Sequence, residues 1–431
     1  MAAKLFTLSL AMTSITCYSQ HTYPTTKKVD HSDEYFGVTV QDPYRWLEDD
    51  RAEDTKDWVQ REVQFTNDYL SKIPFREEIR NQLRDKWNYE KISAPFEEGD
   101  YVYYYKNDGL QAQSVLYRKD KTGTEEVFLD PNKFSTKGTT SLSNLSFNKK
   151  GTLAAYAISE GGSDWNKIII IDAVTKQQIG DTLIDIKFSG IAWQGDEGFY
   201  YSSYDKPQGS ELSAQTDTHK VYFHTLGTKQ KQDQLIIGGS DFKRRYLGAY
   251  LSDDERFLIV SASNTTYGNE LYIKDLKNKT DFITIQKGYD CSSGIIDTKG
   301  DFIYVLTDKN APNNKLQKFD INHPEKWIDV ISETEHVLTV STGGGYIFAK
   351  YMKDALSYVR QLDYNGALIR TIELPGNGTA GGFGGKLKQK DLYYSFTNYI
   401  TPGTIYKFNV ETGKSEVYQR PNVKFNPADY V

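Results

Sequence analysis

The sequence predicts an all-β protein: a seven-bladed β-propeller preceded by a short helical N-terminal segment. Three observations support this prediction, namely a strand pattern that recurs along most of the chain, a regular spacing between its copies, and a high aromatic content. The 431 residues include 32 tyrosines and 21 phenylalanines, whose rings suit the half-buried, pleated surface of strands. Length alone would suggest about three domains of ~150 residues, but the blades of one ring share a core, so one large domain is expected.

The stretch from residue 145 to residue 176 shows the repeating unit. A short apolar run ends in the turn Asn148-Lys149-Lys150-Gly151, an alternating run follows, Gly161-Gly162 interrupts it, and residues 168–171 resume the apolar pattern. This order is typical of a small antiparallel sheet that has an apolar face and nothing of its own to cover it. Such a unit must stack on copies of itself.

Seven copies of this pattern are present, each with a pair of strands rich in aromatic and aliphatic residues. Successive copies are roughly 45 to 58 residues apart, which is the period of four-stranded propeller blades. The pairs lie at residues 101–105 and 115–117, 153–157 and 168–171, 199–201 and 221–226, 257–260 and 271–276, 302–305 and 316–320, 346–349 and 359–363, and 392–394 and 405–409. We therefore expect seven blades in one ring, spanning residues 91–431.

Residues 21–90 lie outside the repeat and predict an extended and helical segment. The acidic string from Asp42 to Asp50 predicts a turn into a helix that ends at Pro74, and a second short helix follows. The aromatic residues of this segment need a surface to cover them, and we expect another domain to provide it. They are Trp46, Trp58, Phe65, Tyr69 and Trp87.

Residues 1–20 have the form of a signal peptide. Lys4 precedes an apolar run from Leu5 to Ile15 that is too short to span a membrane, so we expect a periplasmic or secreted protein. The alternative is a lipoprotein anchored at Cys17, but the residues before Cys17 match such sites poorly. If Cys17 is removed, Cys291 is the one remaining cysteine, and no internal disulfide is expected.

The charge pattern argues against nucleic acid as a partner. The formal net charge is −6, with acidic and basic residues interspersed and no basic stripe.

Several strings resemble the prolyl oligopeptidase family, and its secreted bacterial prolyl endopeptidases in particular. The similarity runs from about Tyr23 to Val431, with the strings in the family's order. They are Tyr23-Pro24, residues 42–48 (DPYRWLE), 107–117 (NDGLQAQSVLY), 128–132 (FLDPN) and 162–165 (GSDW).

The resemblance implies an α/β-hydrolase domain, built from a short N-terminal segment and a long C-terminal part, with the propeller inserted between them. It also implies cleavage of short peptides after proline by a serine, an aspartate and a histidine, in an intact protein that is a monomer. The partners implied are the hydrolase domain, normally on the same chain, and short proline-containing peptides. The N-terminal segment, residues 21–90, would pack on the hydrolase domain.

The sequence itself offers no catalytic residues. A nucleophile elbow needs Gly-x-Ser-x-Gly, and no such string occurs. None of the six histidines has a serine and an acid in such a context. They are His21, His31, His219, His224, His323 and His336. We therefore expect the catalytic domain to be missing from these residues and the chain to be inactive by itself.

Two further sequence patterns resemble a dinucleotide-binding loop and a metal-binding carboxylate cluster, but the residues around them do not support either site. We therefore expect neither a cofactor nor a metal. Residues 376–381 satisfy Gly-x-Gly-x-x-Gly, but the strand and helix of a dinucleotide site do not flank them. Residues 253–255 (DDE) have no spaced partner ligands and are typical of a solvated turn.

By resemblance, Phe188 and Leu247 match positions at which the propeller lines the family's apolar substrate subsite. Both could equally be blade core. Asp164 and Trp165 also match a family string, as a turn residue and a packing residue. The chain departs from some members at Ser263-Asn264, where they place an arginine that reaches the substrate.

Two functions remain in view. The first is the N-terminal and propeller portion of a secreted prolyl oligopeptidase. The second is a free-standing propeller that binds peptide or glycan, which would have no use for the aromatic residues of the N-terminal segment. The first is therefore favoured.

Overall fold

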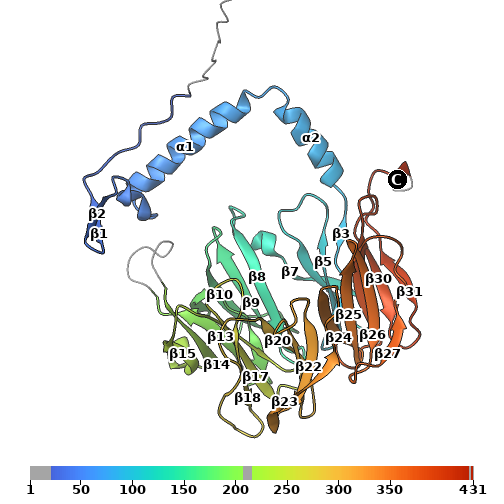
Figure 1. The fold of residues 1–431 in the computed structure, drawn as a ribbon. Coiled ribbons are helices and arrows are strands. Elements are labelled where there is room, and N and C mark those ends of the chain that lie inside the picture. The colour runs from blue at the N-terminus through green and yellow to red at the C-terminus, as the bar shows by residue number, and fades with distance from the viewer. Residues whose placement is uncertain (1–20, 207–215, 427–428, 431) are drawn as a thin grey trace, which may run out of the picture. The chain divides into compact units, whose positions relative to one another are not determined.

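The computed structural model describes residues 21–206, 216–426 and 429–430 (Figure 1). Residues 1–20, and with them the predicted signal peptide and Cys17, lie outside the described residues. The described chain divides into two compact units, residues 21–80 and the residues from 81 onward. Neither of its helices is long and apolar enough to cross a membrane.

The first unit begins with a hairpin and a 3-10 helix and continues into a long helix. The hairpin pairs β1 (Ser32–Tyr35) with β2 (Val38–Gln41), the 3-10 helix covers Arg45–Glu48, and α1 covers Glu53–Ser71. Two acidic residues lie in the first turn of α1, where the helix dipole favours them, and the helix ends shortly before Pro74. After this proline comes α2 (Arg76–Trp87), so both predicted helices form.

The aromatic face of α1 is covered in part by the chain's own first described residues. The ring centroids of Tyr23 and Phe65 are 4.9 Å apart, as are those of His21 and Tyr69. The indole of Trp58 donates a hydrogen bond of 3.0 Å to Thr26. Residues 21–29 therefore run along the helix and cover part of its aromatic face, and cover by another domain stays a prediction for the rest. The side chains of Val59, Val63 and Tyr69 remain exposed.

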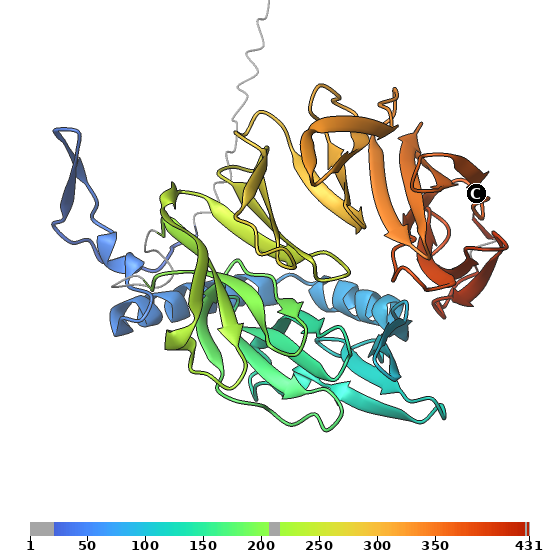
Figure 2. The same cartoon turned by 90° about the horizontal axis from the view of Figure 1, so that it is seen from below.

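The second unit contains seven antiparallel sheets that follow one another around a ring in chain order (Figure 2), which confirms the seven-bladed propeller. Each sheet has four strands, except that the first has β4 as a fifth. The strands of blade 1 are β3 (Lys91–Ile92), β4 (Phe96–Glu98), β5 (Tyr101–Asn107), β6 (Val115–Lys119) and β7 (Glu125–Leu129); of blade 2, β8 (Thr140–Phe147), β9 (Leu153–Glu160), β10 (Trp165–Asp172) and β11 (Leu183–Lys187); of blade 3, β12 (Ala192–Gln194), β13 (Gly198–Tyr204), β14 (Thr218–Thr225) and β15 (Gln234–Lys243); of blade 4, β16 (Tyr246–Leu251), β17 (Phe257–Ser263), β18 (Glu270–Asp275) and β19 (Ile283–Gln286); of blade 5, β20 (Ser293–Lys299), β21 (Phe302–Thr307), β22 (Lys315–Asp320) and β23 (His323–Ile331); of blade 6, β24 (Leu338–Gly343), β25 (Tyr346–Lys353), β26 (Leu356–Leu362) and β27 (Leu368–Thr371); and of blade 7, β28 (Thr379–Gly382), β29 (Asp391–Thr397), β30 (Thr404–Asn409) and β31 (Ser415–Gln419).

In every blade, the strand pair found from the sequence forms the two middle strands. These strands are covered by the neighbouring blades on both faces, so they carry the apolar and aromatic runs. The first strands of neighbouring blades pack against one another, as β8 does with β12 and β20 with β24. They therefore face the axis of the ring. Some first strands are short and small, such as Thr379–Gly382, because little space is left near the axis.

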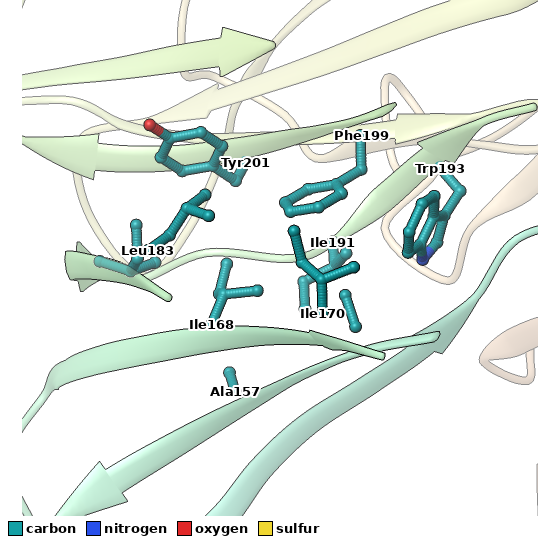
Figure 3. Close-up of a cluster of buried hydrophobic side chains, with 10 residues drawn as sticks. Ala157, Ile168, Ile170, Leu183, Ile191, Trp193, Phe199 and Tyr201 are labelled. Atoms are coloured by element: carbon teal, nitrogen blue, oxygen red, sulfur yellow. The ribbon is translucent and has the colours of Figure 1, made fainter. Parts of the chain in front are cut away.

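The apolar core lies between the blades. In one cluster (Figure 3), Ile168, Ile170 and Leu183 of blade 2 point toward Phe199 and Tyr201 of blade 3. The same arrangement recurs around the ring, with further clusters that join other pairs of blades. Because each blade buries its apolar face on the next, no blade has a core of its own.

The ring closes without an exchanged strand. The last strand, β31, pairs with β30, and both β3 and β4 pair with β5, so blades 1 and 7 are each made of contiguous sequence. One side chain links these two blades: the Lys386 ammonium group donates to the carbonyl oxygen of Glu97 at 2.6 Å and to the carboxylate of Glu98 at 2.8 Å.

Blades 1 and 2 approach each other through backbone at Gly151, which gives a first prediction. Gly151 has a φ of +67°, and a Cβ at this position would overlap the backbone of Gly99. Gly123, with a φ of +87°, has no atom within 4 Å of such a Cβ. We expect Gly123→Ala to cost about 1 kcal/mol of unfolding free energy from backbone strain alone, and Gly151→Ala about 2 kcal/mol, because the two turns must also move apart. Urea unfolding measures both, and equal losses would contradict the close approach.

Candidate functional site

Both ends of the propeller's chain lie at one face of the ring, which we call the terminal face. It is the face at which the second strand of each blade ends and the third begins. On entering the propeller, β3 pairs at Lys91 with Asn107, the last residue of β5, and β31 ends where Gln419 pairs with Ile405. Residues 89–92 and residues 403, 405, 419 and 421 line one pocket of about 220 Å³. In Figure 1, β3 and the C-terminal end accordingly lie at the same side of the propeller.

A second pocket of about 330 Å³ opens at the terminal face of blade 2, beside the connection from β11 to β12. Its walls are largely polar, with Ser159, Ser163, Asp164 and Asn166 on one side and the ring of Phe188 on the other. The size suits a few amino-acid side chains rather than a large cofactor.

Phe188 lies on the connection between β11 and β12, at the edge of this pocket. The residue is 44 % exposed and its φ is +53°, a left-handed conformation that costs a residue other than glycine about 1 kcal/mol. Its ring makes edge contacts with Tyr246 at 5.4 Å and with Tyr204 at 6.4 Å between centroids. Backbone strain of this kind is concentrated at binding sites, where the surroundings hold the residue in place.

Phe188, Tyr204 and Tyr246 together form what we call the aromatic wall. Its three rings come from the blade 2 to blade 3 connection, from the end of β13 and from the start of β16. Tyr204 is nearly buried, and burial raises the pKa of its phenol to about 12. Tyr246 is 48 % exposed, so the wall presents two half-exposed rings on a buried third.

Leu247, the other residue selected from the sequence, is 1 % exposed and belongs to the blade core. Its side chain lies in a cluster with Tyr200, Val221 and Leu258. Neighbouring residues of a strand face opposite sides of the sheet, so the side chains of Leu247 and Tyr246 point in opposite directions. A role for Leu247 in substrate binding stays a prediction.

The remaining family positions also lie near the wall. Ser263, where some members carry an arginine, pairs across the sheet with Tyr246. An arginine, Arg245, directly precedes Tyr246 in the sequence. Its guanidinium group donates to the carbonyl oxygen of Asp241 at 3.0 Å and lies 3.4 Å from the carboxylate of Glu270. It is therefore already engaged within blades 3 and 4. Lys187 places its ammonium group 5.0 Å from the ring of Trp165 and 5.1 Å from that of Phe188, so Trp165 packs beneath a cation.

One histidine and carboxylate pair has the spacing of a catalytic dyad but not its accessibility. The Nδ1 atom of His224 lies 2.8 Å from the carboxylate of Asp233, to which the hydroxyl of Tyr201 also donates. The two paired side chains are 3 % and 2 % exposed, so a substrate does not reach them. The pair fixes β14 against the residues that precede β15.

Comparison with known proteins agrees with the fold. The sequence model of the family described as "Prolyl oligopeptidase, N-terminal beta-propeller domain" matches residues 23–421. The prolyl endopeptidase of Elizabethkingia miricola is 69 % identical over 412 residues, which cover 95 % of this chain and 58 % of that protein. Prolyl oligopeptidase A of Amanita bisporigera is 28 % identical, with coverages of 97 % and 61 %.

Solved structures give the same result. A structure from an analysis of two prolyl endopeptidases superposes with a TM-score of 0.84 at 30 % identity, covering 94 % of this chain and 61 % of that one. Prolyl oligopeptidase B of Galerina marginata, bound to a 35mer hydrolysis and macrocyclization substrate, gives a TM-score of 0.82 at 25 % identity, with coverages of 94 % and 62 %. The chain thus spans about three fifths of the length of the relatives it matches. It belongs to the prolyl oligopeptidase family and contains that family's N-terminal β-propeller domain.

Proposed function

We propose that these residues form the propeller portion of a secreted, serine-type prolyl endopeptidase that cleaves short peptides after proline. The portion has no peptidase activity by itself. The observation that carries the proposal is the 69 % identity to a prolyl endopeptidase along almost all of this chain.

The position of the chain ends defines what the propeller does in this proposal. A hydrolase domain that is joined to both ends must lie over the terminal face, since both ends leave there. The propeller then covers the reaction site, keeps large folded proteins out and removes water from the chemistry. The serine, histidine and aspartate of the reaction belong to the hydrolase domain.

The aromatic wall supplies the propeller's own contact with substrate. Two half-exposed rings beside a pocket of about 330 Å³ offer an apolar surface to a peptide side chain near the proline. Of the wall residues, only Phe188 was selected from the sequence, and its exposure supports that selection.

The first unit would contribute a docking face for the same hydrolase domain. The exposed side chains of Val59, Val63 and Tyr69 lie on α1 and remain open after residues 21–29 have covered the rest of the face. Export would follow from residues 1–20, and N-terminal sequencing of protein recovered from the periplasm or medium tests this directly.

A hybrid enzyme tests the function. The 431 residues are joined to the C-terminal catalytic part of the Elizabethkingia miricola enzyme, and both the hybrid and the 431-residue chain are assayed with a chromogenic peptide that ends in Gly-Pro. We expect the hybrid to release the chromophore and the chain alone to release none. Cleavage by the chain alone, or a folded hybrid without activity, would contradict the proposal.

Within the hybrid, Phe188→Ala tests the wall. We expect KM to rise about tenfold, which corresponds to about 1.4 kcal/mol of lost apolar contact, while kcat changes less than twofold. Phe302→Ala is the matched control, because Phe302 is 39 % exposed but lies at the start of β21, on the face opposite the wall. An equal rise of KM in both variants would show that Phe188 has no special contact with substrate.

A further inference from the structure

His219 is a fully buried side chain that touches three blades at once. The residue is the second of β14 in blade 3 and is 0 % exposed. Its Nε2 atom lies 3.0 Å from the carbonyl oxygen of Lys187, at the end of blade 2. Its Nδ1 atom accepts a hydrogen bond of 2.8 Å from the backbone N–H of Leu247, at the start of blade 4. No step of the proposed peptidase reaction uses this histidine.

These two partners fix the tautomer. A carbonyl oxygen can only accept, so Nε2 carries the hydrogen, and a backbone N–H can only donate, so Nδ1 is bare. The imidazole is therefore neutral, with one donor and one acceptor, and both are used.

Both hydrogen bonds act on the peptide planes of the aromatic wall. The carbonyl of Lys187 belongs to the peptide bond that carries the nitrogen of Phe188. The N–H of Leu247 belongs to the peptide bond that carries the carbonyl of Tyr246. The imidazole thus holds one peptide plane at each of the two exposed rings, and through Lys187 it helps to keep Phe188 in its left-handed conformation.

The third ring of the wall contacts the imidazole directly. Tyr204 pairs across the sheet with His219 and stacks on it, with 4.3 Å between ring centroids and 29° between ring planes. All three residues of the wall are therefore linked to one side chain: Tyr204 contacts it through its ring, and Phe188 and Tyr246 are linked to it through the adjoining peptide bonds.

We propose that His219 is the positioning residue of the aromatic wall: its imidazole sets the separation of Phe188 and Tyr246, and so the affinity for peptides with an apolar side chain before proline. The part of this inference that concerns peptide affinity rests on the proposed function. The part that concerns wall geometry does not.

Two substitutions separate the two hydrogen bonds. In His219→Asn, the amide oxygen lies where Nδ1 was and keeps the bond from Leu247, but the bond to Lys187 is lost. In His219→Gln, the amide nitrogen reaches the position of Nε2 and keeps the bond to Lys187, but the bond from Leu247 is lost. His224→Gln is the matched control, since His224 is also buried in β14 but contacts Asp233 instead of the wall.

The first readout is structural and uses the full chain. In a long-range ¹H–¹⁵N spectrum of chain labelled at histidine, we expect His219 to show a protonated Nε2 and a bare Nδ1. In crystal structures, we expect His219→Asn to displace Phe188, His219→Gln to displace Tyr246, and His224→Gln to leave both in place. A charged imidazole, the opposite tautomer, or unmoved rings in both His219 variants would overturn the proposal.

The second readout is the affinity of the full chain for the blocked peptide acetyl-Phe-Gly-Pro amide, measured by titration. We expect both His219 variants to bind at least fivefold more weakly than the native chain, and His224→Gln to bind as the native chain does. Native affinity in variants whose wall has moved would overturn the link to peptide binding. If the wall moves but the native chain binds no peptide, the link to peptide affinity is overturned and the assignment of His219 to the wall is supported by the structures, while the activity of the hybrid enzyme decides the proposed function separately.

Discussion

Replacing Phe383 with alanine is expected to lower the free energy of unfolding by about 3–5 kcal/mol. The ring is 0 % exposed and stacks between two others, at 4.5 Å from Tyr394 of blade 7 and 5.4 Å from Phe348 of blade 6. A third ring, that of Phe408, meets it edge-on at 5.7 Å. Removing a side chain so placed leaves a cavity between the last two blades that rigid neighbouring strands cannot close.

The backbone at Phe383 makes the prediction sharper. Its φ is +66°, a conformation that glycine adopts freely and alanine does not. Phe383→Gly should therefore be at least as stable as Phe383→Ala, which reverses the usual order of these two residues in strands. Urea unfolding at constant m-value measures both, with the exposed Phe302→Ala as a control that should lose less than about 1 kcal/mol. A glycine variant clearly less stable than the alanine variant would contradict the strained conformation.

Acid is expected to destabilise the propeller through His219. Burial lowers the pKa of this imidazole from its usual 6.5 to about 4, although its hydrogen bond to Lys187 acts in the opposite direction. Between pH 6.5 and pH 4, the unfolded chain then binds a proton that the folded chain does not. The free energy of unfolding should fall by about 1.4 kcal/mol for each pH unit in this window, and by about 3 kcal/mol across it.

The comparison with His219→Gln isolates this contribution. Carboxylates whose folded pKa is lowered, such as Asp275 beside Arg256, add their own acid destabilisation in both proteins. The difference between the two pH profiles removes that background. We expect the native profile to be steeper by one proton between pH 6.5 and pH 4, whatever the offset between the curves. Parallel profiles would show that His219 titrates in the folded chain as it does in the unfolded one.

The sequence predicted the parts of the fold that depend on burial along a single strand. The middle strands of the blades are apolar on both faces, so each of the seven blades could be recognised in the sequence from its pair of apolar runs. The sequence did not predict that residues 21–29 cover Trp58 and Phe65, because an extended segment without a periodic apolar pattern gives no indication of the surface on which it packs.

The site was predictable only in part, for a related reason. Phe188 was found through a family resemblance, but Tyr204 and Tyr246 reach it from other blades, and nothing in the local sequence links them. Leu247 is buried beside the exposed Tyr246, and its role in substrate binding stays a prediction. His219 lies in no nucleophile-elbow context, and its hydrogen-bond partners are backbone atoms, which a search for side-chain motifs does not detect.

The two chain ends at the terminal face have a consequence for how a larger protein of this kind folds. Folding of the propeller brings together two chain positions that are more than three hundred residues apart, because residues 89–92 line the same small pocket as residues 419 and 421. The entropic cost of closing a loop rises with the logarithm of its length. A domain that is joined to both ends therefore folds at the lower entropic cost of a short connection once the propeller has folded. The hydrogen bonds from Lys386 to Glu97 and Glu98 would then stabilise more than the ring, because separation of blades 1 and 7 would lengthen the connection to any domain joined at both ends.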